Sequence, residues 1–133
     1  MTDRFVYHCA VRWSDMDAYG HVNNARFLTL YEEARVAMMF TGAREVGLTS
    51  LEAGVIIARH EVDYLRPVDY GDPVRIEMWI EDIRAARFTV AYELFDGEVL
   101  ASRARTICAP YQLSEQRPRR LTEAERAFLS GYE

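Results

Sequence analysis

Polar side chains that could carry out chemistry gather in one short stretch, residues 14–24, with the sequence SDMDAYGHVNN. Two aspartates, a histidine and two asparagines there run straight into an apolar segment with helical spacing, and packing alone does not explain them. A carboxylate can attack a carbonyl carbon or activate water. The first amides of a helix have no intrahelical partner and can hold a developing oxyanion. The stretch therefore contains both parts of a hydrolytic site.

Three further residues of this stretch would shape such a site. Gly20 allows the backbone to turn closely past a ligand. Asn23 or Asn24 can cap the following helix and leave neighbouring N–H groups free.

The helix that these residues precede is predicted over residues 24–41. Its polar positions Arg26, Thr29 and Glu33 share one narrow face, and apolar side chains cover most of the rest. Such a helix should be wrapped by a sheet rather than lie on a surface. Gly42 is predicted to cap its C-terminus.

Alternating apolar and polar residues predict five strands, over residues 4–13, 55–65, 74–83, 88–95 and 99–109. Residues 44–54 are predicted to hold one further helical turn, Asp96-Gly97 a hairpin turn, and residues 122–129 a closing helix with a capping box between Thr122 and Glu125. On the inner faces we expect Phe5, Tyr7, Cys9, Val11 and Trp13 in the first strand, and Ile56, Ala58, His60, Val62 and Tyr64 in the second.

Tight turns between most of these strands require antiparallel pairing, which excludes a doubly wound parallel sheet. We therefore predict an α+β fold in one domain over residues 1–133, with a five-stranded antiparallel sheet around the long helix. Such a sheet has two edges, and edges are commonly hidden by pairing with another subunit, so we predict at least a homodimer.

Composition excludes several classes of function. All 16 basic residues are arginine, which removes lysine Schiff bases and the phosphate loop that needs a lysine. A net charge of −5 argues against nucleic-acid binding, and no apolar run is long enough to span a membrane. The N-terminus lacks the apolar core of a signal peptide, and two distant cysteines fit a reducing cytoplasm. Without HExxH, paired cysteines or GxSxG, we expect neither a metal site nor a serine hydrolase.

The DxDxxGHVNN string of residues 15–24, together with the YLRP and GD residues 64–67 and 71–72, resembles the signature of hotdog-fold thioesterases, closest to the 4-hydroxybenzoyl-CoA thioesterase-like group. The resemblance implies a hotdog fold, a homodimer or homotetramer, and hydrolysis of an acyl-CoA without a cofactor. It also implies that Asp17 is the nucleophile or general base and that the amide at Asn24 polarises the thioester carbonyl. Asp15 is then a turn former.

His21 has two open interpretations. Related plant acyl-ACP enzymes combine the aspartate with an asparagine and a histidine in this turn, but Tyr19 stands at the position of that asparagine. His21 could carry a proton or could organise the loop. Tyr19 could also line the acyl pocket.

Three residues elsewhere are candidate substrate-binding groups. His60 could meet substrate or could be a core or interface histidine, while its neighbours Glu61 and Asp63 are expected in solvent. By resemblance, Arg84 and Arg87 would meet the nucleotide phosphates of CoA; a solvated hairpin is the alternative. A hotdog hydratase or dehydratase, and an acyl-CoA-binding module without activity, are the other functions considered.

Overall fold

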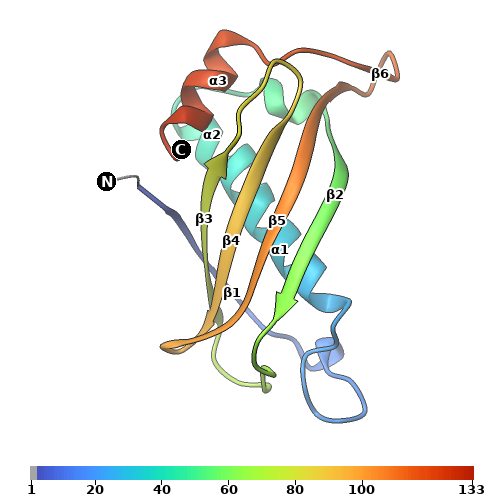
Figure 1. Ribbon diagram of the computed structural model, residues 1–133, viewed down its shortest axis with the longest axis vertical. Helices are drawn as coiled ribbons and strands as arrows, with labels where there is room; N and C mark the ends of the chain where they lie inside the picture. Colours follow the sequence, from blue (N-terminus) through green and yellow to red (C-terminus); the bar gives the residue numbers. More distant parts are fainter. Residues whose placement is uncertain (1–2) are drawn as a thin grey trace.

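The computed structural model describes residues 3–133 and shows a curved antiparallel sheet with a long helix packed against one face (Figure 1). The strand order is β1-β3-β4-β5-β2, which leaves β1 and β2 at the edges. The predicted α+β fold with five main strands is confirmed. In chain order the elements are β1 (Phe5–Cys9), the 3-10 turn η1 (Trp13–Asp15), α1 (Arg26–Val36), the π-helical η2 (Ala37–Gly42), α2 (Ala43–Glu45), η3 (Ser50–Ala53), β2 (Val55–Tyr64), β3 (Val74–Glu81), β4 (Phe88–Asp96), β5 (Val99–Gln112), the short β6 (Arg117–Pro118) and α3 (Glu123–Ser130).

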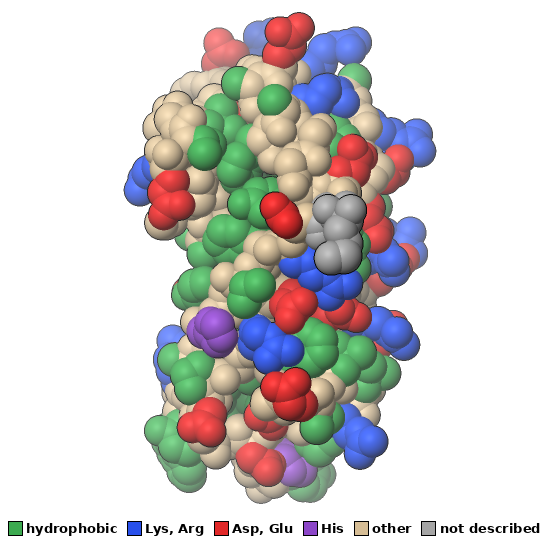
Figure 2. Space-filling view, turned by 90° about the vertical axis from the view of Figure 1, so that its left-hand side faces the viewer, with side chains coloured by type: hydrophobic (Ala, Val, Ile, Leu, Met, Phe, Trp, Pro, Cys, Tyr) green, Lys and Arg blue, Asp and Glu red, His purple; other side chains and the backbone are tan. Residues whose placement is uncertain are grey.

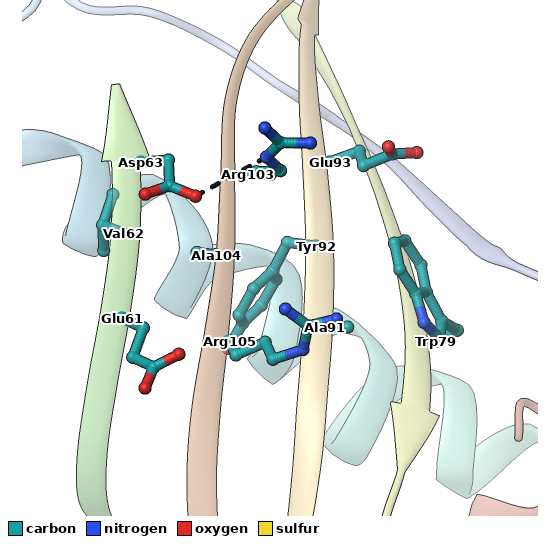
Figure 3. A pocket seen from close by; sticks show the side chains of 10 residues that line it. All are labelled: Glu61, Val62, Asp63, Trp79, Ala91, Tyr92, Glu93, Arg103, Ala104 and Arg105. Atoms are coloured by element: carbon teal, nitrogen blue, oxygen red, sulfur yellow. Dashed lines mark ion pairs between the residues drawn. The ribbon is translucent and has the colours of Figure 1, made fainter. Parts of the chain in front are cut away.

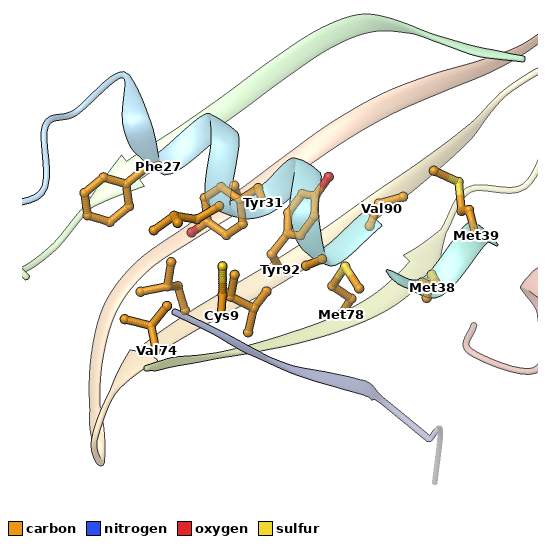
Figure 4. Close-up of a cluster of buried hydrophobic side chains, with 14 of the residues drawn as sticks. Cys9, Phe27, Tyr31, Met38, Met39, Val74, Met78, Val90 and Tyr92 are labelled. Carbon is orange, nitrogen blue, oxygen red and sulfur yellow. The ribbon is translucent and has the colours of Figure 1, made fainter. Parts of the chain in front are cut away.

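The core lies between α1 and the concave face of the sheet (Figure 4). Phe27 and Tyr31 of α1 point onto side chains of β3 and β4 such as Met78 and Tyr92, and all four are buried. Strand β3 alternates strictly between buried and half-buried positions, as a sheet with one covered face requires. Full burial of an apolar side chain of this size contributes about 1.5–3 kcal/mol. Phe27 also packs edge-on against Tyr64, which holds the first turn of α1 against the end of β2.

The predicted C-cap at Gly42 is wrong. The helix passes through Gly42 in a π-helical stretch and continues to Glu45, and the chain turns away at Gly47, whose φ is +80°. Gly42 instead allows close packing, since a Cβ there would lie 3.1 Å from a ring carbon of Phe5. The glycine is therefore a contact point for β1, which sequence periodicity does not reveal.

Two face assignments in the strands also differ from the prediction. Trp13 is 76% exposed, because the chain leaves β1 at Cys9 and curls into η1 before reaching it. In β2 the register shifts between Ile57 and Arg59, so Ala58 is the extra residue of a β-bulge. The bulge pairs Ile57 with the buried Cys108, but Ile56, Ile57 and Ala58 are all exposed, so the predicted burial of Ile56 and Ala58 is not found.

The predicted capping box of the closing helix is confirmed. The Thr122 hydroxyl accepts the amide of Glu125 at 3.1 Å, and the Glu125 carboxylate accepts the amide of Thr122 at 2.9 Å. Glu125 is fully buried and also binds Arg119 through both carboxylate oxygens, at 2.7 and 2.8 Å. This ion pair holds α3 against Arg119, which directly follows β6.

Charges of both signs are interleaved on the face shown in Figure 2. Arg4 illustrates the pattern, since its guanidinium pairs with Glu77 and Glu93 on neighbouring strands. Within residues 3–133, no helix has the length and apolar character needed to cross a membrane.

Candidate active site

Asp17 lies in a loop that its own side chain helps to close. The amide of Asp17 donates to the carbonyl of His21 at 2.8 Å, and the amide of Gly20 donates to the carbonyl of Asp17 at 3.1 Å. Gly20 has φ +78°, a conformation that glycine adopts without strain. The Oδ1 atom of Asp17 accepts the amide of Tyr19 at 2.8 Å. In the described part of the chain, Oδ2 has no hydrogen-bond partner, so one oxygen anchors the loop and the other is available.

At the N-terminus of α1, one backbone amide is available to donate a hydrogen bond to a ligand. The amides of Ala25 and Arg26 donate to the side chain and the carbonyl of Asn23, both at 2.9 Å, and the Asn23 amide donates to the carbonyl of Asp15 at 2.8 Å. The helix begins at Arg26 with Ala25 as its N-cap and has no side-chain cap, so the predicted capping by Asn23 or Asn24 is wrong. The Asn23 side chain instead forms a turn before the helix by accepting the amide of Ala25. Among the hydrogen bonds described for residues 3–133, none uses the Asn24 amide as donor. This N–H lies at the positive end of the helix dipole and can bind an oxyanion.

Asp15 has a structural role, as predicted for a turn former. Its side chain is fully buried, and its carboxylate accepts the amide of Arg12 at 2.9 Å and the Arg12 guanidinium at 3.0 Å. Burial alone would raise the pKa of Asp15, but the hydrogen bonds from Arg12 outweigh it and lower the pKa below its usual value. Asp15 therefore stays ionised and anchors the start of the loop.

Asp17 and Asn24 line the same pocket, which has a volume of about 530 Å³. Polar residues of the loop, His21 and Asn23, also line it. The remaining lining residues are apolar or aromatic apart from Arg66, and they are Val22, Phe27, Tyr64, Leu65, Arg66 and Pro67. A carboxylate and a helix-terminal amide thus share a pocket with an apolar wall, which suits an acyl group.

His21 and Tyr19 are placed differently from each other. The His21 ring lines the pocket, but its Nε2 atom lies 3.4 Å from Oδ1 of Asp69, and the backbone of the two residues forms a β-bridge. This arrangement favours the loop-organising interpretation of His21. Tyr19 is 85% exposed and is not among the residues that line the pocket.

His60 lies outside the pocket, at the end of a buried chain of hydrogen bonds. The Arg35 guanidinium donates to the Tyr92 hydroxyl at 3.0 Å, that hydroxyl donates to Thr106 at 2.8 Å, and Thr106 lies 2.9 Å from Nδ1 of His60. Burial and the Arg35 charge lower the pKa of His60. Arg35 is only 4% exposed and lies on the covered face of α1 with Tyr31 and Ala34.

Arg84 and Arg87 are also outside the pocket. They close the β3–β4 turn, where the amide of Arg84 donates to the carbonyl of Arg87 at 2.8 Å, and both are exposed. In Figure 1 this turn lies at the opposite end of the sheet from the loop of residues 16–24. One chain alone therefore does not bring them to Asp17.

A larger hollow, of about 670 Å³, lies on the outer face of the sheet (Figure 3). Its charged side chains already pair within the sheet: Arg103 with Asp63 at 3.5 Å, and Arg105 with Glu81 at 2.8 Å. Glu61 and Asp63 are exposed on this face, as predicted, and are separated by the sheet from the helix mouth. This hollow offers neither a free charge nor a helix-terminal amide to a substrate.

Comparison with known proteins shows the family to which the chain belongs. Residues 11–129 match the family model described as the thioesterase-like superfamily. The chain belongs to this superfamily. The resemblance to hotdog-fold thioesterases is therefore confirmed at the level of the family.

Individual known proteins are similar to most of the chain. A 1,4-dihydroxy-2-naphthoyl-CoA hydrolase of Trichodesmium erythraeum is 31% identical, covering 95% of this chain and 96% of that protein. A thioesterase of Thermus thermophilus, solved with coenzyme A and Zn, is 29% identical with a TM-score of 0.78, covering 96% and 92% of the two chains. A predicted thioesterase of Bacillus stearothermophilus, at 23% identity, shares the fold with a TM-score of 0.85 over 98% and 96% of the chains.

Proposed function

We propose that this protein is an acyl-CoA thioesterase, which hydrolyses its substrate to a free acid and CoA. The observation that carries the proposal is the shared pocket of the Asp17 carboxylate and the free Asn24 amide. In this mechanism the Asn24 N–H binds the thioester oxygen and stabilises the negative charge that develops on it. A single donor of this kind contributes about 10²–10³-fold to the rate.

Asp17 supplies the other half of the reaction. Its free Oδ2 either attacks the thioester carbon and expels the CoA thiolate, leaving an anhydride for water to cleave, or removes a proton from an attacking water. Both routes consume one water and release the acid and CoA. The hydrogen bond from Tyr19 to Oδ1 supports either route, because it holds the carboxylate in one orientation.

Relatives support a CoA substrate. Several are named 1,4-dihydroxy-2-naphthoyl-CoA hydrolases, and the Thermus thermophilus structure contains coenzyme A. We extend acyl-CoA hydrolysis to this chain, with the acyl group against the wall that Phe27 and Tyr64 form.

We further propose a homodimer through the edge strand β2. Ile56 and Ile57 on this strand are 41% and 38% exposed, and Leu65 beyond its end is 42% exposed. Antiparallel pairing of β2 with its copy would complete the open edge. In such a pair the partner's sheet runs in the opposite direction. The partner's β3–β4 turn then lies near the end of the sheet where this chain has its loop of residues 16–24. Arg84 and Arg87 could then reach the CoA phosphates across the interface.

The test is release of free thiol from a panel of acyl-CoAs with short, medium, long and aromatic acyl groups. We expect turnover by the parent and its loss in Asp17→Asn. Asp63→Asn is the matched control, since Asp63 lies on the outer face of the sheet. Binding of acyl-CoA without thiol release from any member of the panel would contradict hydrolysis and favour a binding module.

A further inference from the structure

Tyr64, at the end of β2, reaches across to the mouth of α1. Its hydroxyl donates a hydrogen bond of 2.8 Å to the carbonyl oxygen of Asn24, 40 residues away in the sequence. Its ring packs edge-on against Phe27, with ring centroids 5.1 Å apart. The side chain thus contacts both the backbone that carries the candidate oxyanion donor and the first turn of the helix behind it.

We propose that Tyr64 is a positioning residue, which aims the Asn24 amide at the thioester oxygen through its hydrogen bond to the Asn24 carbonyl. The proposal rests on the proposed thioesterase function. The Asn24 N–H belongs to the peptide before the residue, and its C=O belongs to the peptide after it. Fixing both peptides fixes the two backbone dihedrals of Asn24 and therefore the direction of its N–H.

The first of these peptides is held through its oxygen, because the Asn23 carbonyl accepts the amide of Arg26 at 2.9 Å. The second is held on its nitrogen side by the bond from Ala25 to the Asn23 side chain at 2.9 Å. Its oxygen side is held by Tyr64. Oxyanion donors must lie about 3 Å from the position that the oxyanion will occupy. A small rotation of the Asn24 amide would therefore lower the rate of hydrolysis.

The hydroxyl of Tyr64 is suited to this role at neutral pH. Burial raises its pKa, so it stays protonated and continues to donate. The role also differs from that of a catalytic residue, since the hydroxyl acts on the backbone of Asn24 and not on the reacting atoms.

The test is Tyr64→Phe, which removes the hydroxyl and keeps the ring on Phe27. We expect kcat to fall about tenfold, because the donor is misaligned rather than removed. KM and the melting temperature should stay at parental values. Tyr132→Phe is the matched control, since Tyr132 packs against Phe5 and Phe128. No hydroxyl hydrogen bond is described for it in residues 3–133.

Two binding measurements separate positioning from a structural role. A CoA thioether has no carbonyl oxygen, so its affinity should not change in Tyr64→Phe. A trifluoromethyl ketone analogue of acyl-CoA forms a tetrahedral oxyanion, so its affinity should fall by the same factor as kcat. Parental kcat in Tyr64→Phe, or equal losses for both analogues, would overturn the proposal. If Asp17→Asn loses turnover while Tyr64→Phe does not, only the role of Tyr64 fails; if the parent releases no thiol, both proposals fail.

Discussion

The carbonyl oxygen of Asp15 accepts a hydrogen bond of 2.8 Å from the amide of Asn23, which joins the start of the loop to the start of the helix. Between these residues the chain makes a closed turn, and Asp17 and Asn24 come to line one pocket. The buried Asp15 carboxylate and this backbone hydrogen bond thus hold the two groups that the proposed mechanism needs. Substitution of the Asp17 carboxylate should therefore affect chemistry before it affects folding.

Asp17→Asn should fold normally and lose at least about 100-fold in kcat. The asparagine oxygen can still accept the amide of Tyr19, so the loop is kept, but the amide nitrogen can neither attack nor accept a proton. Thiol release and thermal unfolding of the variant measure the two effects separately. Turnover close to that of the parent would remove Asp17 from the mechanism.

His21→Ala should lower the rate modestly and leave the shape of the pH–rate profile unchanged. The reason is that the described partner of the ring is Asp69, at 3.4 Å, rather than Asp17. The measurement is kcat/KM against pH for variant and parent. Disappearance of one limb of the profile in the variant would instead assign proton transfer to His21.

Reversal of both charges in Arg84→Glu/Arg87→Glu should raise KM for acyl-CoA, because the CoA phosphates would lose their cationic partners. Cleavage of a short acyl thioester of N-acetylcysteamine, which lacks these phosphates, should be unchanged. Arg117→Glu/Arg120→Glu changes the charge equally at another exposed site and serves as control. Equal effects on the two substrates would discard the phosphate-binding role.

Ile57→Glu should weaken the proposed dimer, since it places a charge on the edge strand where the copy would pair. Sedimentation at micromolar concentration should show a dimer for the parent and a shift toward monomer for this variant. Val99→Glu is the matched control, because Val99 is 50% exposed on the β4–β5 hairpin. A parent that sediments only as monomer would contradict the dimer.

Stability should fall in acid between about pH 4.5 and 2 through Glu125. Burial alone would raise the pKa of this carboxylate, but hydrogen bonds from Arg119, Ser50 and the Thr122 amide outweigh it and lower the pKa to about 2. A carboxylate whose pKa is lowered by folding stabilises the protein above its unfolded pKa, and this stabilisation is lost as the pH falls toward the folded value.

Urea unfolding at several pH values tests this point. Glu125→Gln should be destabilised by about 3 kcal/mol at neutral pH, because the Arg119 charge loses its buried partner, and should depend less on pH below 4.5 than the parent. Glu115→Gln removes an exposed carboxylate, 4.0 Å from Arg117, and should follow the parent. A Glu125→Gln curve parallel to that of the parent would contradict the assignment.

Features determined by neighbours a few residues apart could be predicted from the sequence. The capping box of Thr122 and Glu125 and the hairpin at Asp96-Gly97 both rest on hydrogen bonds or dihedrals within one turn of chain. The strand periodicities likewise predicted the sheet, and the loop motif predicted Asp17 and Asn24 as candidate site residues, both of which line the pocket.

Tertiary structure decided what depends on contacts between distant segments. The bulge at Ala58 changed the register of β2 and therefore which of its side chains lie on each face. The approach of Phe5 gave Gly42 a packing role instead of a capping one. Tyr64 meets Asn24 only because β2 ends beside the mouth of α1. Local periodicity carries no information on such distances, because they depend on how the whole sheet curves around the helix. The sequence by itself therefore determined the candidate groups of the proposed site, and packing decided how they are held.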